Sequence, residues 1–149
     1  MIFVNSFQIN VPLEQVAEFH SRSANMAAIT PPPVIVRIHD APERLNEGDQ
    51  MSFTLWIGPF PVHWQARITD VSKNGFIDQQ ISGPFEKWEH HHRFKAIDEN
   101  RSKVSDEVHI TLSKQPLKYL IGLGMALSLP LLLTYRGWKT RRLLKNSNR

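Results

Sequence analysis

Two histidines between aromatic residues have the spacing best suited to chemistry in this chain. They lie in the run W-E-H-H-H-R-F, near the middle of the sequence. A β-strand alternates its faces at every residue, so His90 and His92 share one face and His91 points to solvent. Trp88 and Phe94 border the two imidazoles on that inner face. An imidazole on such an apolar face needs a hydrogen-bonding partner, a polar cavity or a ligand.

A carboxylate is predicted to lie beside these imidazoles. The next strand follows the turn Asp98-Glu99-Asn100. Counting outward from that turn places Asp106 opposite His90 or His92, where it can fix a tautomer or hold a charged imidazole. The alternation of the preceding strand places Gln79 on the same inner face.

Three kinds of site remain open for this polar set. His90, His92 and Asp106 can form a structural hydrogen-bonded group, anchor a ligand, or act as a catalytic acid and base. A metal would use the same three side chains, but this spacing is common and no cysteine is present to form a zinc-thiolate site. We therefore predict no metal, no cofactor and no assigned catalytic residue. Whether the protein is an enzyme stays open, and binding without chemistry is the leading interpretation.

The surrounding elements follow from the periodicity of the apolar residues. A strand over residues 2–9 precedes two short helices, which Thr30-Pro31-Pro32-Pro33 ends. Six strands are then expected over residues 34–38, 51–57, 62–69, 76–81, 85–94 and 104–112, followed by a long helix over about 116–145. This order predicts an α+β domain spanning residues 1–149, with a curved antiparallel sheet of about seven strands and the final helix packed across it.

An apolar wall is expected around the polar set. Its predicted members face inward by strand alternation, and we expect them, with His90, His92, Asp106 and Gln79, to bind a ligand: Phe53, Leu55, Trp64, Trp88, Phe94 and Val108.

Composition narrows the class of partner. The 149 residues are 41% hydrophobic and 21% charged, with a net charge of +4 and no cysteine. These values are typical of a globular protein with a core, and a cytoplasmic location is the default expectation. Basic residues gather from Arg136 to the end, but they do not alternate with aromatic residues, so no nucleic acid is expected as a partner.

The final helix allows two interpretations. Residues 119–135 carry no charge, tyrosines lie at both ends, and basic residues follow. Such a segment can contact or enter a membrane, because about 17 apolar residues are the lower limit for a span. A helix gripped by a curved sheet is apolar on a wide face as well. We expect a core helix whose outer side can also meet a membrane surface or a second copy in a homodimer.

Several short motifs, taken in order, resemble one family. They are Thr30-Pro31-Pro32, Gly58-Pro59-Phe60-Pro61-Val62-His63-Trp64, Gly83-Pro84-Phe85 with the histidine strand, Asp106-Glu107-Val108, and Tyr135-Arg136. Together with the order of elements, they resemble a bacterial branch of the START-like (SRPBCC) superfamily, which includes polyketide cyclases and lipid-transport domains.

The resemblance implies a helix-grip fold, in which a curved sheet encloses the C-terminal helix and an apolar cavity lies between them. It implies that the protein binds, and possibly transports, a hydrophobic small molecule or lipid. The alternatives are a cyclase- or dehydratase-type enzyme that uses His90 or His92 with Asp106, and an interaction module anchored to a membrane by residues 119–135. Some members of the branch are fused to a sugar-epimerase-like domain, and these 149 residues contain no segment of that kind.

Overall fold

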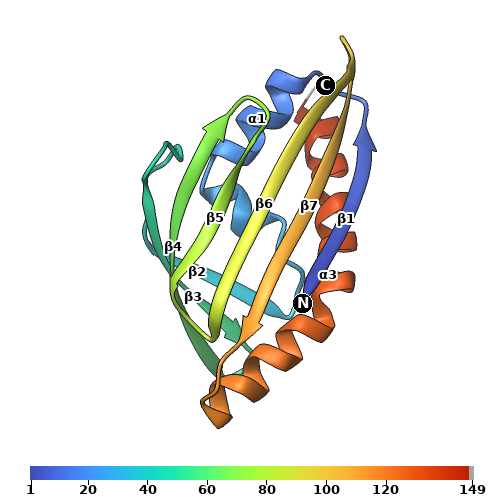
Figure 1. Ribbon diagram of the computed structural model, residues 1–149. Coiled ribbons are helices and arrows are strands. Elements are labelled where there is room, and N and C mark those ends of the chain that lie inside the picture. Colours follow the sequence, from blue (N-terminus) through green and yellow to red (C-terminus); the bar gives the residue numbers. More distant parts are fainter. Residues whose placement is uncertain (148–149) are drawn as a thin grey trace.

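Within residues 1–147, which this computed structural model describes, the chain forms one seven-stranded antiparallel sheet and three helices (Figure 1). The strands are β1 (Ile2–Ile9), β2 (Val34–Asp40), β3 (Gln50–Ile57), β4 (Phe60–Ser72), β5 (Gly75–Ser82), β6 (Phe85–Asp98) and β7 (Arg101–Leu112). The helices are α1 (Leu13–Ser21), α2 (Ala24–Ala28) and α3 (Pro116–Ser147). The predicted α+β architecture, with two short helices after the first strand, is confirmed.

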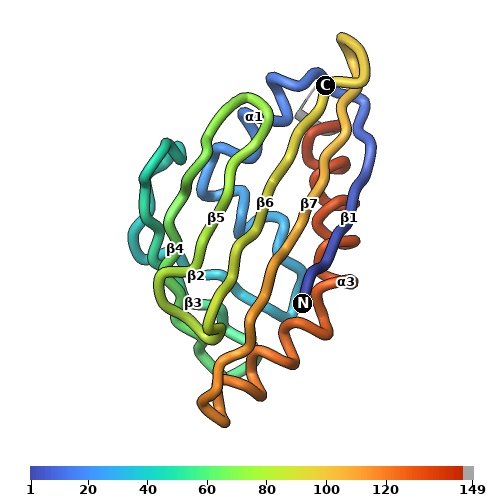
Figure 2. Tube along the Cα trace, in the orientation of Figure 1, coloured from blue at the N-terminus to red at the C-terminus, as the bar shows by residue number. Residues whose placement is uncertain are grey.

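The sheet is strongly curved, and its helices lie on the concave side (Figures 1 and 2). The strand order is β1-β7-β6-β5-β4-β3-β2, so β2 to β7 form a meander and β1 closes the edge beside β7. Helix α3 packs against β1, β7 and β6, and α1 packs against β6 and β7. The long helix therefore covers one end of the concave face.

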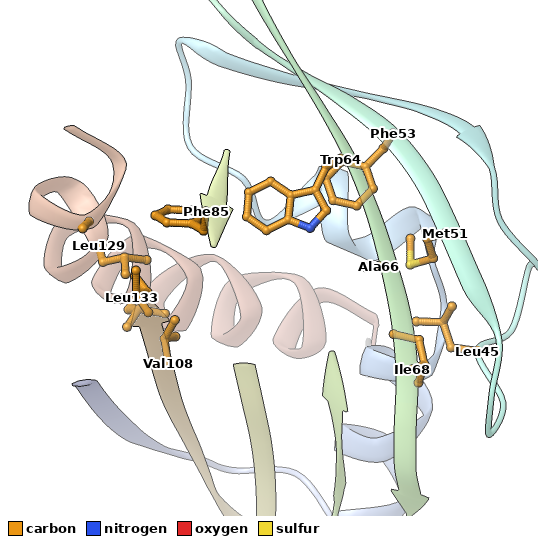
Figure 3. Packing of buried hydrophobic residues seen from close by; sticks show 12 residues of the cluster. Leu45, Met51, Phe53, Trp64, Ala66, Ile68, Phe85, Val108, Leu129 and Leu133 are labelled. Atoms are coloured by element: carbon orange, nitrogen blue, oxygen red, sulfur yellow. The ribbon is translucent and has the colours of Figure 1, made fainter. Parts of the chain in front are cut away.

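Strand alternation directs the apolar side chains into the concave face. Phe53 lies opposite Trp64 across β3 and β4, and Met51 lies opposite Ala66. These side chains join residues of α3 in one buried cluster (Figure 3), whose members are Leu45, Met51, Phe53, Trp64, Ala66, Ile68, Phe85, Val108, Ile110, Ala126, Leu129 and Leu133. A second buried cluster connects α1, β1 and the end of α3 and contains Phe94.

Close contact between α3 and the sheet depends on small residues. A Cβ atom added at Gly137 would lie 2.9 Å from Cδ1 of Phe7, and one at Gly122 would lie 3.2 Å from Cε1 of Phe85. Both positions therefore let the helix backbone approach an aromatic ring on the sheet. Pro130 is exposed and does not end the helix, which continues through it to Ser147.

Ser23 directly precedes α2 and makes no side-chain cap hydrogen bond. Its hydroxyl instead donates to the carbonyl of Pro42 at 2.7 Å. Ser23 therefore fixes the helix pair to the segment between β2 and β3.

Candidate functional site

Four polar side chains form a block on the concave face, where three adjacent strands meet. Asp78 lies on β5, His90 and His92 on β6, and Asp106 on β7. The strand register pairs Asp78 with His90 and His92 with Asp106. Paired residues on neighbouring strands project from the same face, so all four side chains converge. We refer to these four residues as the polar block.

Each imidazole bonds a carboxylate diagonally across the sheet. Its partner is the aspartate that the strand register pairs with the other histidine. His90 Nε2 lies 2.8 Å from Asp106 Oδ1, and His92 Nε2 lies 3.1 Å from Asp78 Oδ2. The Nδ1 atoms lie farther away, 3.7 Å from Asp78 Oδ2 for His90 and 3.5 Å from Asp106 Oδ1 for His92. Because an ionised carboxylate only accepts hydrogen bonds, Nε2 is the donor on both rings. Asp106 thus reaches the histidines, as the strand count predicts.

The polar block also satisfies one condition for a metal site. Asp78, His90 and His92 offer three ligand atoms within 4.8 Å of one another. However, the two imidazoles are stacked, with ring centroids 3.8 Å apart and planes inclined by 27°. An imidazole binds a metal through a lone pair in its ring plane, so an ion between stacked rings would lie outside both planes. The geometry favours a hydrogen-bonded block over a metal centre.

Burial sets the charge state of the block. Desolvation, followed by the nearby His90, lowers the pKa of His92 to about 3. Burial is the largest influence on the Asp106 carboxyl group and raises its pKa, but the hydrogen bond from His90 together with the charge interactions with His90, His92 and Arg136 brings the net pKa below the ordinary value. Burial also opposes ionisation of Asp78, but the hydrogen bond from His92 and the charge interactions with both histidines and Arg136 together lower its net pKa. At neutral pH the block therefore holds two carboxylates and a neutral His92.

Two residues of the helices face the block and were not among the predicted site residues. His20 of α1 donates from Nδ1 to the carbonyl of Val16 at 2.9 Å, and burial lowers its pKa to about 4. Arg136 of α3 is half-buried and lies close enough to both carboxylates to stabilise their charged forms. A sequence signal existed for both, because His20 follows buried Val16 by four residues and Arg136 follows buried Leu133 by three.

One predicted site residue lies on the opposite face. Gln79 pairs with Glu89 in the sheet register, and its side-chain amide donates to Glu89 Oε2 at 3.3 Å on the convex side. Asp78 takes the inward position instead. The prediction of Gln79 was wrong because the sequence Phe76-Ile77 is apolar at both parities, so alternation alone did not fix the face. Counting outward from the two-residue turn Gly83-Pro84 places Asp78 opposite Glu89, one residue away from the observed pairing with His90, so the turn did not reveal Asp78 either.

Three of the predicted aromatic residues, Phe53, Trp64 and Trp88, pack together beside the polar block. The rings of Trp64 and Trp88 meet edge to face with centroids 5.1 Å apart, and Trp64 also contacts Phe53 at 5.9 Å and Phe85 at 5.8 Å. Figure 3 shows the Trp64 indole between Phe53 and Phe85. Trp64 is 5% exposed, and its Nε1–H has no hydrogen-bond partner among the described residues. A buried donor without a partner is costly, so this nitrogen is an unsatisfied donor within the core.

The other predicted wall residues separate into two environments. Leu55 faces inward and is half-buried, whereas Val108 is fully buried beneath α3. Phe94 lies at the far end of the histidine strand in the second core cluster, where its ring centroid is 4.7 Å from that of His20. Leu55 therefore remains partly accessible, and Val108 and Phe94 serve as core.

A set of half-buried apolar residues, which we call the apolar lining, packs against the main core cluster on the concave face. Its members come from α2, from α3 and from the strands: Met26, Val36, Ile38, Leu55, Phe76, Trp88, Met125 and Leu132. The Asp78 side chain lies next to this lining and retains 24% exposure, while His90 retains 3%. Asp78 is therefore the part of the polar block that solvent or a ligand reaches most readily.

Two hollows on the surface lie away from the polar block. One, of about 400 Å³, is bordered mainly by α1, including Glu14, Glu18 and Phe19. The other, of about 230 Å³, lies near the N-terminus on β1, β6 and β7. Neither is lined by His90 or His92, so an apolar molecule would have to enter the concave face by displacing or spreading its half-buried lining.

The curved sheet, the gripped helix and the inward polar block define a protein of the START-like, helix-grip class. A model of the family described as polyketide cyclase / dehydrase and lipid transport matches residues 9–133, and the chain belongs to this family. The family predicted from the motifs is confirmed. No curated protein sequence matches the chain.

Solved structures agree with this fold. The Zhui aromatase/cyclase from Streptomyces sp. R1128 is 14% identical with a TM-score of 0.68, over 96% of this chain and 95% of that chain. A START superfamily protein from Mycobacterium smegmatis is 10% identical with a TM-score of 0.61, over 93% of this chain and 98% of that one. A nucleoside-diphosphate sugar epimerase from Corynebacterium glutamicum is 23% identical with a TM-score of 0.67, and matches 96% of this chain but 29% of its own length. At these identities the likeness concerns the fold.

Proposed function

We propose that the protein binds a hydrophobic small molecule or lipid on its concave face, without needing to transform it. The observation that carries this proposal is the half-buried apolar lining beside Asp78 and Trp88. Apolar side chains that the chain's own core leaves partly exposed lose this contact with water when an apolar molecule covers them. The family, which includes lipid transport, supports the same class of ligand.

The polar groups on the concave face indicate which polar atoms such a ligand carries. Trp64 offers an unpaired N–H donor in a surrounding of aromatic rings. Burial of an oxygen acceptor against this donor satisfies both groups. We therefore expect the ligand to carry a carbonyl, ether or hydroxyl oxygen within its apolar body, and Asp78 to accept a hydrogen bond from any donor it presents.

Two fluorescent probes test this proposal on the purified protein. Prodan is apolar and carries a ketone oxygen, whereas N-phenylnaphthylamine is apolar and carries no oxygen. Replacement of Trp64 by Phe keeps an aromatic ring, smaller than the indole, and removes the donor, so it should weaken prodan binding about fivefold and leave N-phenylnaphthylamine within about twofold. Trp56→Phe, on the convex face, is the matched control.

The outcomes separate the two parts of the proposal. Equal losses for both probes would contradict the role of the Trp64 donor while leaving apolar binding intact. No binding of either probe by the unaltered protein would contradict the proposed function itself. Native mass spectrometry of the freshly purified protein adds an independent measurement, with a bound apolar molecule as the expected result.

A cyclase- or dehydratase-type activity is the alternative, because His90 and Asp106 form a short hydrogen bond of the kind that orients a general base. Against it, His90 and His92 are 3% and 4% exposed, and a neutral His92 with a pKa of about 3 is a weak base. If the protein turned over a ligand, His90→Gln and His92→Gln would abolish turnover while keeping binding. Equal turnover in these variants would exclude their catalytic role.

A further inference from the structure

The outer side of α3 carries a continuous stripe of exposed apolar residues. Its members are Leu117, Leu120, Leu127, Leu131 and Trp138, with exposed fractions from 49% for Trp138 to 78% for Leu131. Their spacings of three, seven, four and seven residues keep them on one face of a helix. At 1.5 Å per residue the stripe is about 30 Å long. We refer to these five residues as the leucine stripe.

The opposite side of the helix is committed to the core. Ala126, Leu129 and Leu133 are at most 3% exposed and pack on the sheet. By length and composition alone, Pro116–Lys145 could cross a membrane. Insertion across a bilayer would remove these three residues from the core and uncover the concave face, so the helix can offer only its outer side while the domain stays folded.

The charge around the stripe has one sign. After Glu107 the chain contains eight lysines and arginines and no acidic residue, although the preceding part has ten basic and fourteen acidic residues. Lys114 and Lys118 are exposed at one end of the stripe, and Arg142 and Lys145 are exposed at the other. The last cation, Arg149, lies outside the described residues.

This charge pattern decides between the possible occupants. A second copy packed stripe to stripe would bring cations against cations in either direction, because α3 has no acidic residue to pair with them. An anionic lipid surface has the opposite charge and also accepts apolar side chains to a shallow depth. Aromatic residues favour the membrane–water interface, and Trp138 lies at the basic end of the stripe with the guanidinium of Arg142 5.4 Å from its ring centroid.

We propose that the leucine stripe docks the protein on an anionic lipid bilayer, with α3 lying in the plane of the surface. In this orientation the leucine side chains enter the boundary between headgroups and acyl chains, and the cations at both ends contact lipid phosphates. The proposal is independent of whether the concave face binds a ligand.

Vesicle cosedimentation of the full chain tests this proposal. We expect binding to vesicles of phosphatidylcholine mixed with phosphatidylglycerol, weaker binding to phosphatidylcholine alone, and release by added salt. The double variant Leu127→Glu with Leu131→Glu should reduce the bound fraction to background. The matched control is Phe60→Glu, which charges an equally exposed apolar residue outside α3.

A second variant changes charge and leaves the stripe intact. Arg142→Gln with Lys145→Gln should weaken binding to the anionic vesicles about thirtyfold, since each cation near such a surface contributes about a factor of five. Urea unfolding of all variants checks that the fold is kept.

Three results would overturn the proposal. The first is equal binding to neutral and anionic vesicles. The second is a lipid-free dimer that the leucine variant dissociates, which would assign the stripe to a second copy. The third is a protein that resists alkaline carbonate extraction from membranes, which would show that α3 spans the bilayer.

Discussion

The polar block joins two imidazoles to two carboxylates, and of the four side chains only Asp78 has more than slight exposure to water. His90 bonds Asp106 and His92 bonds Asp78, while each ring also lies within 4 Å of the other carboxylate. Removal of one member therefore leaves a buried polar group without its partner, which is more costly than the net contribution of the original hydrogen bond. At the residue scale, the block should behave as one unit in stability and in its response to pH.

The substitution Asp106→Asn tests this unit. It exchanges the charged acceptor of His90 for a neutral amide and adds an N–H donor to the buried block, so it should lower the free energy of unfolding by about 2–4 kcal/mol. The neighbouring Glu107→Gln removes an exposed carboxylate that pairs with His109 on the convex face, and should change it by less than about 0.5 kcal/mol. Urea unfolding measures both, and a similar cost for the two variants would contradict the account.

Stability should fall as the solution becomes acidic. The pKa values of His92 and His20 are about 3 and about 4 in the folded protein, against an ordinary value of 6.5. The unfolded chain therefore binds more protons below pH 6.5, and the stability present above that pH is lost as pH falls toward the folded pKa values. The lowered pKa values of Asp78 and Asp106 extend the loss below their ordinary value of 3.8.

The pH dependence of the urea midpoint measures this linkage. Between neutral pH and pH of about 4, the midpoint of the unaltered protein should decrease, and His92→Gln should flatten the dependence. His91→Gln is the matched control, because His91 lies on the convex face beside Glu89 and its replacement should change the slope less than His92→Gln does. An unaltered slope in His92→Gln would show that this imidazole does not carry the linkage.

The long helix α3 depends on how closely it approaches the sheet. Gly137 and Gly124 both lie within the helix, but an added Cβ meets the Phe7 ring only at Gly137 and meets nothing within 4 Å at Gly124. A substitution at Gly124 therefore changes helix propensity alone, whereas the same substitution at Gly137 also changes the packing of α3 on the sheet. Both substitutions lie in α3 and leave the polar block unchanged.

Substitution of each glycine by alanine should act in opposite directions. Gly124→Ala should raise the free energy of unfolding by about 0.5–1 kcal/mol, because alanine is the better helix former. Gly137→Ala should lower it by about 1–3 kcal/mol through overpacking against Phe7. Thermal unfolding measures both variants, and equal stabilisation by the two would contradict the close approach of α3 to β1.

The elements show why sequence predicts this fold better than its site. Alternation in β4 and β6 predicts that Trp64, His90 and His92 point inward, because polar and apolar residues occupy opposite faces of these two strands. In β5 both parities are apolar at the start, so Asp78 and Gln79 could not be told apart by alternation. His20 and Arg136 were missed because they approach from helices, and the distance of a helix from a strand is not written in a local pattern.

The whole molecule presents two apolar surfaces with different surroundings. The lining of the concave face adjoins carboxylates and aromatic rings, whereas the leucine stripe is bordered by cations. Membership of a family that includes lipid transport is compatible with both surfaces serving lipids. The proposed functions are nevertheless separable, because charged substitutions in the stripe leave the concave face unchanged.

Binding of N-phenylnaphthylamine to the concave face tests the central claim most directly. Leu55→Gln places an amide in the half-buried lining, and Ile35→Gln makes the same change in chemistry on the exposed face of the neighbouring strand. The account predicts that Leu55→Gln raises the dissociation constant about tenfold, which is a loss of about 1.4 kcal/mol in binding free energy. It predicts that Ile35→Gln changes the constant less than twofold. Equal effects of the two substitutions, or no binding by the unaltered protein, would contradict it.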